Sequence, residues 1–292
     1  MSHRSGFVNI LGNPNVGKST IMNALVGEKL SIISPKAQTT RHRIMGIVNS
    51  EDFQIVYSDT PGILKPKYKL QETMMSSVNS ALADADMILY ITDVTERTAD
   101  ESEYIDRIKS SGIPAIIAIN KIDLSNQADL EKIVESWHKA FPLSPVIPMS
   151  ALKGFNLDAL LNAVLEKLPE GPPYFPKDQL TDKFEKFFAS EMIREKILFH
   201  YKKEIPYSVE IEIESFSDES SIIKIRALIH VTRDSQKGII IGHKGNMLKR
   251  VGTEARKEME NFFGKKIFLE LYVKVTKDWR DKQSALKKFG YR

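Results

Sequence analysis

The chain has 292 residues, 42% of them hydrophobic and 27% charged, a composition that excludes disordered, collagen-like and low-complexity proteins. It contains no cysteine, which excludes a disulfide framework and thiolate metal sites. No apolar stretch approaches the roughly 20 residues that span a bilayer, and the opening "MSHRSGFVNILG" is unlike a secretory signal. We therefore expect a cytoplasmic protein with room for two domains.

Charge is distributed unevenly along the chain. Residues 1–176 hold 17 Lys and Arg against 20 Asp and Glu, whereas the remainder holds 25 against 18. The basic second part indicates a polyanionic partner, although a solvated basic surface would have the same composition.

Short apolar segments alternate with helical patterns through the first 170 residues, which indicates βαβ units around a doubly wound, mostly parallel sheet. The expected strands are 6–12, 53–59, 87–94, 114–121 and 144–151, and the expected helices are 18–26, 70–85, 100–111, 129–140 and 156–167. Sheets of this kind bind ligands beyond the carboxyl ends of their strands, where the polar motifs of this chain lie.

A proline-rich stretch, "LPEGPPYFPKDQL", separates this pattern from a second one. After it we expect a helix over 182–201, strands over 207–216 and 222–231, helical sequence over 239–264 and a strand over 265–276. The order α-β-β-α-α-β predicts a smaller α+β domain. The predicted divisions are an α/β domain over 1–170, a linker over 171–180, the α+β domain over 181–280 and a basic tail over 281–292.

The first motif lies between an expected strand and an expected helix. Gly-x-x-x-x-Gly-Lys-Ser/Thr is satisfied by Gly12, Asn13, Pro14, Asn15, Val16, Gly17, Lys18 and Ser19. The backbone N–H groups of such a loop and the positive end of the following helix surround phosphate oxygens. Lys18 is expected to neutralise the β and γ phosphates, and the Ser19 hydroxyl to bind Mg²⁺.

Two segments are expected to sense the γ phosphate. Asp59, Thr60, Pro61 and Gly62 follow a strand, so that Asp59 can hold Mg²⁺ through water and the Gly62 N–H can meet the phosphate. Gln38, Thr39, Thr40, Arg41 and His42 form a polar switch segment, in which Thr40, or else Thr39, can ligate Mg²⁺ while GTP is bound. We predict Lys18, Thr40 and Gly62 as the catalytic groups.

The base is indicated by "NKID", which comprises Asn120, Lys121, Ile122 and Asp123. The Asp123 carboxylate can accept hydrogen bonds from the N1–H and 2-amino groups of guanine, which adenine does not offer in that pattern. Ser150, Ala151 and Leu152 end the next strand and can meet the guanine O6 through a backbone N–H.

In the second domain, Gly242, His243, Lys244 and Gly245 lie between an apolar segment and a basic helix. Such a turn lets the backbone of single-stranded RNA approach closely, and Lys249 and Arg250 extend the positive surface. The Gly-x-x-Gly pattern alone is common in turns, and exposed helical lysines are often only solvated. Farther on, the chain carries residues that can either pack on the domain or meet RNA: Trp279, Arg280, Lys287, Lys288 and Arg292.

Taken in order, "GNPNVGKS", "QTTRH", "DTPG", "NKID" and "SAL" resemble the motifs of the translation-factor-related branch of P-loop GTPases. Within that branch, "AQTTRHRIMGI" and the second domain are similar to the Era family of bacterial GTPases, over essentially the whole chain. The resemblance implies GTP or GDP with Mg²⁺ as ligands and a type II KH (K-homology) domain. It also implies binding of 16S ribosomal RNA near its 3′ end, action in maturing the 30S subunit, and peripheral association with the inner membrane, with no DNA expected.

Ile63 follows "DTPG" directly, where many GTPases have a glutamine that orients the attacking water. An apolar side chain cannot do so, and slow intrinsic hydrolysis is expected. In similar GTPases the asparagine that corresponds to Asn15 ligates K⁺, which could act like an arginine finger; Asn15 could equally stabilise the loop.

Two other readings remain at this point. The protein could be a ribosome-associated RNA-binding scaffold in which guanine nucleotide is mainly structural. It could also be a tRNA-modification GTPase, but the second half has neither a further catalytic constellation nor the C-terminal cysteine of such enzymes.

Overall fold

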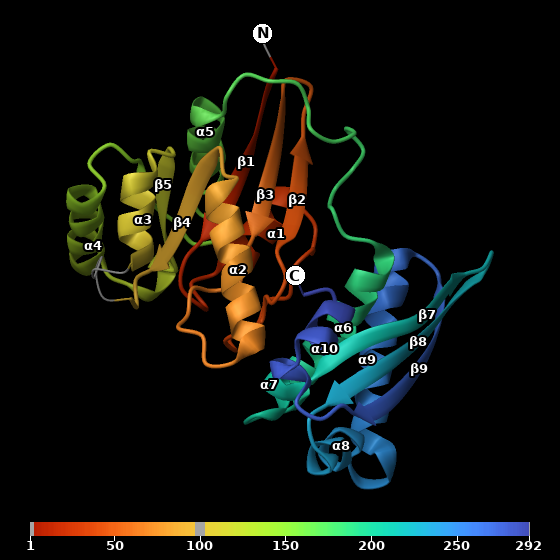
Figure 1. Cartoon of the computed structure of the whole chain (residues 1–292). Coiled ribbons are helices and arrows are strands. Elements are labelled where there is room, and N and C mark those ends of the chain that lie inside the picture. The colour runs from red at the N-terminus through yellow and green to blue at the C-terminus, as the bar shows by residue number, and fades with distance from the viewer. Residues whose placement is uncertain (1–2, 97–102, 292) are drawn as a thin grey trace. The chain divides into compact units, whose positions relative to one another are not determined.

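The computed structural model describes residues 3–96 and 103–291 (Figure 1). Within these residues the chain divides into two compact units. Of the described residues, the first unit comprises 3–65, 74–96 and 103–182, and the second comprises 66–73 and 183–291. Residues 100–102 of an expected helix, and Arg292, lie outside the described residues.

The first unit contains a six-stranded sheet in the order β2-β3-β1-β4-β5-β6. The strands are β1 (Arg4–Leu11), β2 (Ile44–Asn49), β3 (Phe53–Asp59), β4 (Met87–Asp93), β5 (Ala115–Asn120) and β6 (Val146–Pro148). All neighbours run parallel except β2 and β3. Every residue of β4 and β5 is buried, as expected for strands covered on both faces. The predicted doubly wound, mostly parallel fold is confirmed.

Helices lie on both faces of this sheet. They are α1 (Lys18–Val26), α2 (Lys69–Ala83), α3 (Glu103–Ser111), α4 (Gln127–Ala140) and α5 (Leu157–Lys167). In Figure 1, α2 and α3 lie in front of the sheet, and α5 lies behind it, where it contacts α1. The loops that follow the parallel strands all begin at the carboxyl-end side of the sheet, which brings the predicted motifs together.

Strand β2 was not predicted, because its sequence "IMGIVN" is short and contains a glycine. The glycine has a packing reason: a Cβ atom on Gly46 would lie 2.7 Å from Cγ2 of Val26, at the end of α1. Only glycine lets the helix approach this antiparallel edge strand so closely.

The expected linker runs along the outside of the first sheet. The side-chain oxygen of Gln54 accepts hydrogen bonds from the N–H groups of Tyr174 (2.7 Å) and Phe175 (2.9 Å). The Ile47 N–H donates to the Leu180 carbonyl at 2.8 Å, and Gly46 forms an isolated bridge with Thr181. These contacts attach the segment to β2 and β3 of the first unit.

The second unit is a three-stranded sheet in the order β7-β8-β9, with β7 and β8 antiparallel and β8 and β9 parallel. Its elements are α6 (Glu185–His200), α7 (Ile205–Ser208), β7 (Glu210–Asp218), β8 (Ile222–Val231), α8 (Asp234–Ile241), the 3-10 helix η2 (His243–Gly245), α9 (Asn246–Phe263) and β9 (Lys266–Val275). Helices α6 and α9 pack against the sheet and against each other. Apart from the short α7 and η2, the observed order is the predicted α-β-β-α-α-β.

Residues 281–291, which were expected to belong to a basic tail, are part of the folded second unit. The 3-10 helix η3 (Trp279–Asp281) and helix α10 (Gln283–Lys288) follow β9. Trp279 is fully buried and donates from Nε1 to the Ser208 carbonyl at 3.0 Å. The Tyr291 hydroxyl donates to Glu210 at 2.6 Å. Burial of these aromatic side chains explains why the segment packs on the domain.

Candidate functional site

The phosphate loop connects β1 to α1, and two of its glycines are required by close contacts. A Cβ atom would lie 2.1 Å from the Ile91 carbonyl oxygen if placed on Gly12, and 2.2 Å from the Asn120 amide nitrogen if placed on Gly17. Both glycines also have positive φ. The narrow fit follows from the neighbouring strands β4 and β5, whose ends contact the loop.

Lys18 points into the curve of this loop. Its Nζ donates to the carbonyl oxygens of Gly12 at 3.0 Å and Asn13 at 2.7 Å. Burial lowers the pKa of Lys18 to about 8, although the negative charges of Asp59 and Glu96 oppose the change. A buried ammonium of this kind gains most from a negative ligand, which is what phosphate oxygens provide.

Three oxygen ligands meet beside Lys18. The Ser19 hydroxyl donates to Oδ2 of Asp59 at 2.7 Å, the Thr40 hydroxyl donates to the same oxygen at 3.2 Å, and the two hydroxyls lie 3.0 Å apart. Asp59 is completely buried, and its Oδ1 has no hydrogen-bond partner among the described residues. Burial raises the pKa of Asp59, against the hydrogen bond from Ser19 and the attraction of Lys18.

This arrangement fits Mg²⁺, which prefers oxygen ligands and keeps water and phosphate oxygens in its shell. The orphaned Oδ1 shows that Asp59 retains capacity for a cation or its water. Thr39 instead donates to the Lys36 carbonyl at 2.6 Å, so Thr40 is the threonine of the pair that lies at this position. The described part of the chain has no cluster of three His, Cys, Asp or Glu residues suited to a metal.

Gly62 lies directly on the phosphate loop. A Cβ atom there would be 2.7 Å from Cα and 2.8 Å from N of Pro14, while the next N–H, that of Ile63, donates to the Gly12 carbonyl at 3.2 Å. Thr60 is anchored by a hydrogen bond from its hydroxyl to the Ile10 carbonyl at 2.7 Å. The "DTPG" segment is therefore held against the loop where the terminal phosphate is expected.

The side chain of Asn120 joins the base motif to backbone groups of the phosphate loop and of the "SAL" segment. Asn120 donates from Nδ2 to the Val16 carbonyl at 2.8 Å and accepts at Oδ1 from the Ala151 N–H at 3.0 Å. It therefore braces two loops from within. Asp123 accepts a hydrogen bond from the Ser150 hydroxyl at 2.5 Å, which orients its carboxylate.

One buried carboxylate in this region was missed from the sequence. Asp93, the last residue of β4, is 3% exposed and forms an ion pair with Lys121 at 2.5 Å. Burial acts to raise its pKa, but the hydrogen bonds from Lys121 and Thr95 outweigh burial and hold the pKa below its ordinary value. No motif marks Asp93; its position at the carboxyl end of a parallel strand is the one available signal.

A pocket of about 510 Å³ joins these groups. Its lining includes these predicted residues: Pro14, Asn15, Gly17, Lys18, Ser19, Gln38, Thr39, Thr40, Thr60, Gly62, Asn120, Lys121, Asp123, Ser150 and Leu152. Outside this lining are Gly12, Asn13, Val16, Asp59, Pro61, Arg41, His42, Ile122 and Ala151. Of these, Asp59 is completely buried, and Val16 and Arg41 are each 1% exposed. The structure thus collects phosphate, switch and base residues in one cavity.

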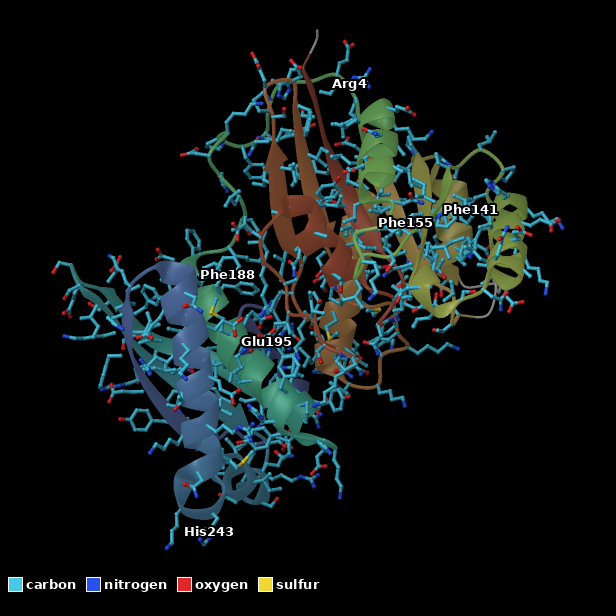
Figure 2. The ribbon with its side chains drawn as sticks, turned by 180° about the vertical axis from the view of Figure 1, so that it is seen from behind. Arg4, Phe141, Phe155, Phe188, Glu195 and His243 are labelled. Carbon is cyan, nitrogen blue, oxygen red and sulfur yellow. The ribbon has the colours of Figure 1, made fainter. Side chains whose placement is uncertain are left out.

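The second candidate site is the turn between α8 and α9. Lys244 has a positive φ of 49°, and a Cβ atom on Gly242 would lie 2.7 Å from Cγ of Met247. His243 is exposed, and Figure 2 shows it at the outer end of the unit with its side chain directed away from the helices. Beside the turn lies a pocket of about 390 Å³, lined by Gly245, Leu248, Lys249, Gly252, Thr253, Arg256, Leu269 and Leu271.

The two basic residues predicted on α9 differ in their surroundings. Arg250 pairs with Glu254 at 3.1 Å, whereas Lys249 is exposed, lines the pocket and has no ion-pair partner among the residues that the structure describes. Lys249 is therefore the better placed of the two to meet a phosphate.

Each of the two units matches a known protein family. A family described as 50S ribosome-binding GTPase matches residues 7–121, and the KH domain family matches residues 204–280. The GTPase Era of Ruminiclostridium cellulolyticum is 43% identical over 294 residues, which cover 100% of this chain and 99% of the relative. The chain belongs to the Era family of GTPases. The GTPase Era of Staphylococcus haemolyticus is 44% identical over 291 residues, covering 99% and 97%.

Solved Era structures have the same fold. One is a crystal structure of Era with MgGDPNP and nucleotides 1506–1542 of 16S ribosomal RNA, and another is of a single-residue variant of Aquifex aeolicus Era bound to GDP·AlF4⁻. Each gives a TM-score of 0.95 at 42% identity and covers 99% of both chains. The expected GTPase fold with a C-terminal KH domain, and GTP hydrolysis as the activity, are confirmed.

Proposed function

We propose that this protein is a GTP-hydrolysing switch that binds 16S ribosomal RNA near its 3′ end and acts in maturation of the 30S subunit. The pocket between α9 and β9, next to the Gly242–Gly245 turn, is the observation that carries the proposal. Its apolar floor and lysine rim suit unpaired bases and their phosphates. The Era complex with a 16S fragment supports the choice of RNA. Because 16S RNA belongs to the 30S subunit, we propose that subunit as the target, although the matching family is described as 50S ribosome-binding.

Gly252 provides a test of this pocket. A Cβ atom there would lie 3.1 Å from Cδ1 of Leu271, within the pocket lining. Gly252→Ala is expected to weaken binding of a 16S 3′ fragment about tenfold, equivalent to about 1.4 kcal/mol. Alanine favours a helix over glycine by about 0.5–1 kcal/mol, so thermal stability should not fall. Fluorescence anisotropy with labelled RNA would measure the affinity.

Gly238→Ala, in α8, is the matched control, because no atom lies within 4 Å of its added Cβ. Equal RNA affinities for the two variants would exclude the pocket as the binding site. A scrambled strand that binds as well as the 16S fragment would argue for charge attraction alone.

The scaffold alternative predicts GTP hydrolysis that is independent of RNA. In our proposal GTP orders the segments around Thr40 and Asp59–Gly62, and RNA binding alters turnover. Single-turnover hydrolysis with and without the 16S fragment separates the two, since an unaltered rate would favour the scaffold.

We further propose that K⁺ binds at Asn15 and compensates for Ile63. Asn15 is exposed, its φ is 68°, and its side chain makes no hydrogen bond to the described residues, which leaves its oxygen available to a cation. Turnover is expected to be at least about tenfold faster in K⁺ than in Na⁺, since a charge in this role can contribute far more. Rates should be compared at equal ionic strength.

Asn15→Ala is expected to remove most of this difference and to leave the rate in Na⁺ nearly unchanged. A wild-type protein that turns over equally fast in both salts would refute the role of potassium. A difference that persists undiminished in the variant would place the ion elsewhere.

We propose the cytoplasm as the site of action, with peripheral attachment to the inner membrane. None of the helices in the described residues has the length and apolar character required to cross a bilayer. Release of the protein from the membrane fraction by a salt wash would agree with such attachment, and its absence from that fraction would contradict it.

A further inference from the structure

Asp93 is fixed by hydrogen bonds at the end of β4, and its partner Lys121 lines the nucleotide pocket. Its Oδ2 accepts from Nζ of Lys121 at 2.5 Å, and its Oδ1 accepts from the Thr95 N–H at 2.8 Å and the Thr95 hydroxyl at 2.5 Å. Since both carboxylate oxygens are engaged and the residue is buried, its orientation is defined by the end of β4. Asp93 does not line the nucleotide pocket.

Lys121 carries this contact into the phosphate loop. Its Nζ also donates to the Asn15 carbonyl at 2.6 Å, next to the Val16 carbonyl that accepts from Asn120. Two successive loop carbonyls are therefore held by two successive residues of the base motif. A lysine has a long, flexible stem, so its ammonium needs a second partner to stay at the loop.

We propose that Asp93 is a positioning residue for nucleotide binding, which acts by holding the Lys121 ammonium on the Asn15 carbonyl. Asn15 is thereby kept in its left-handed conformation, and the loop N–H groups are arranged before phosphate binds. The same contact positions the Asn15 side chain for K⁺; this part rests on the proposed role of potassium.

Asp93→Asn tests the proposal, because it removes the charge but keeps the size and an acceptor. The affinity for GDP and the affinity for GTP are each expected to fall about tenfold, comparable to the loss of metal affinity when a hydrogen-bond partner of a metal ligand is removed. The KM should rise, while kcat at saturating GTP and K⁺ stays within about twofold. The K⁺ concentration for half-maximal turnover should rise as well.

A double-mutant cycle separates positioning from general damage. Lys121→Met keeps an apolar stem of similar length in the pocket lining and removes the ammonium, so Asp93→Asn should cause little further loss of affinity in that background. Asp129→Asn is the control, since this carboxylate is exposed and its side-chain partners, Asn126 and Lys132, both lie at the start of α4, away from the phosphate loop. Thermal unfolding of each variant checks folding.

Unchanged nucleotide affinity in Asp93→Asn, or losses that add fully with Lys121→Met, would overturn the proposal. If the asparagine variant folds poorly, Asp93→Glu keeps the charge and should retain affinity within about threefold; a tenfold loss there with intact folding would also count against it. Nucleotide affinities should be measured without RNA, first in Na⁺ and then in K⁺. A result obtained in this way does not depend on whether the RNA-binding and potassium proposals are correct. The affinity loss is expected in both salts.

Discussion

Replacing Asp123 by asparagine is expected to weaken GTP binding by about 10⁴-fold and to create affinity for xanthosine triphosphate. The carboxylate is expected to accept hydrogen bonds from the N1–H and 2-amino groups of guanine, whereas an asparagine amide presents a donor there. Xanthine has a carbonyl oxygen in place of the 2-amino group, so the donor finds an acceptor. The Ser150 hydroxyl, 2.5 Å from Asp123, keeps this group oriented.

Titration calorimetry with both nucleotides would measure the exchange of specificity. Asp158→Asn is a suitable control, because Asp158 is exposed in the first turn of α5. A variant that still prefers GTP over xanthosine triphosphate would show that another group recognises the base.

Gly62→Ala is expected to lower kcat by about 10²–10³-fold, the usual cost of losing a hydrogen-bond donor that serves the transition state. The added Cβ would lie 2.7 Å from Cα of Pro14, a backbone atom that cannot move aside without moving the phosphate loop. The Gly62 N–H is therefore displaced from the γ-phosphate position. GDP, which has no γ phosphate, should lose much less affinity.

Single-turnover hydrolysis and GDP binding measured together would check this expectation. Gly238→Ala again serves as a control for an added methyl group in open space. Equal losses in GDP affinity and in kcat would mean that the substitution disrupts the whole loop rather than the phosphate contact.

The parts of the molecule that sequence reasoning predicted depend on local patterns. The loop Gly12–Ser19 and the turn Gly242–Gly245 are specified by residues adjacent in the chain. Their glycines mark positions where the backbone has a positive φ. The parallel strands were recognisable as continuous apolar segments, since both of their faces are covered. The role of Asp123 in binding guanine stays a prediction, which rests on chemistry because few groups pair with the guanine edge.

What could not be predicted depends on contacts between distant residues. Gly46 makes the sequence of β2 unlike that of a strand. A glycine is needed there because Val26, on helix α1, packs against this position. Asp93 follows an ordinary strand, and its meaning comes from Lys121, 28 residues later. Trp279 could equally well pack on the domain or meet RNA until its partner Ser208 is known, and no local pattern links Tyr291 to Glu210.

The hydrogen bonds that β2 donates to the Leu180 region also bear on how the chain is synthesised. The outer edge of β2 is contacted by Leu180 and Thr181, which lie beyond the last helix of the first unit, so this edge stays unpaired until those residues have been synthesised. Before then, β2 presents an open edge, the kind of surface on which unfinished chains pair with one another. A protein shortened to residue 170 would keep that exposed edge permanently, even though every nucleotide-binding motif would be present.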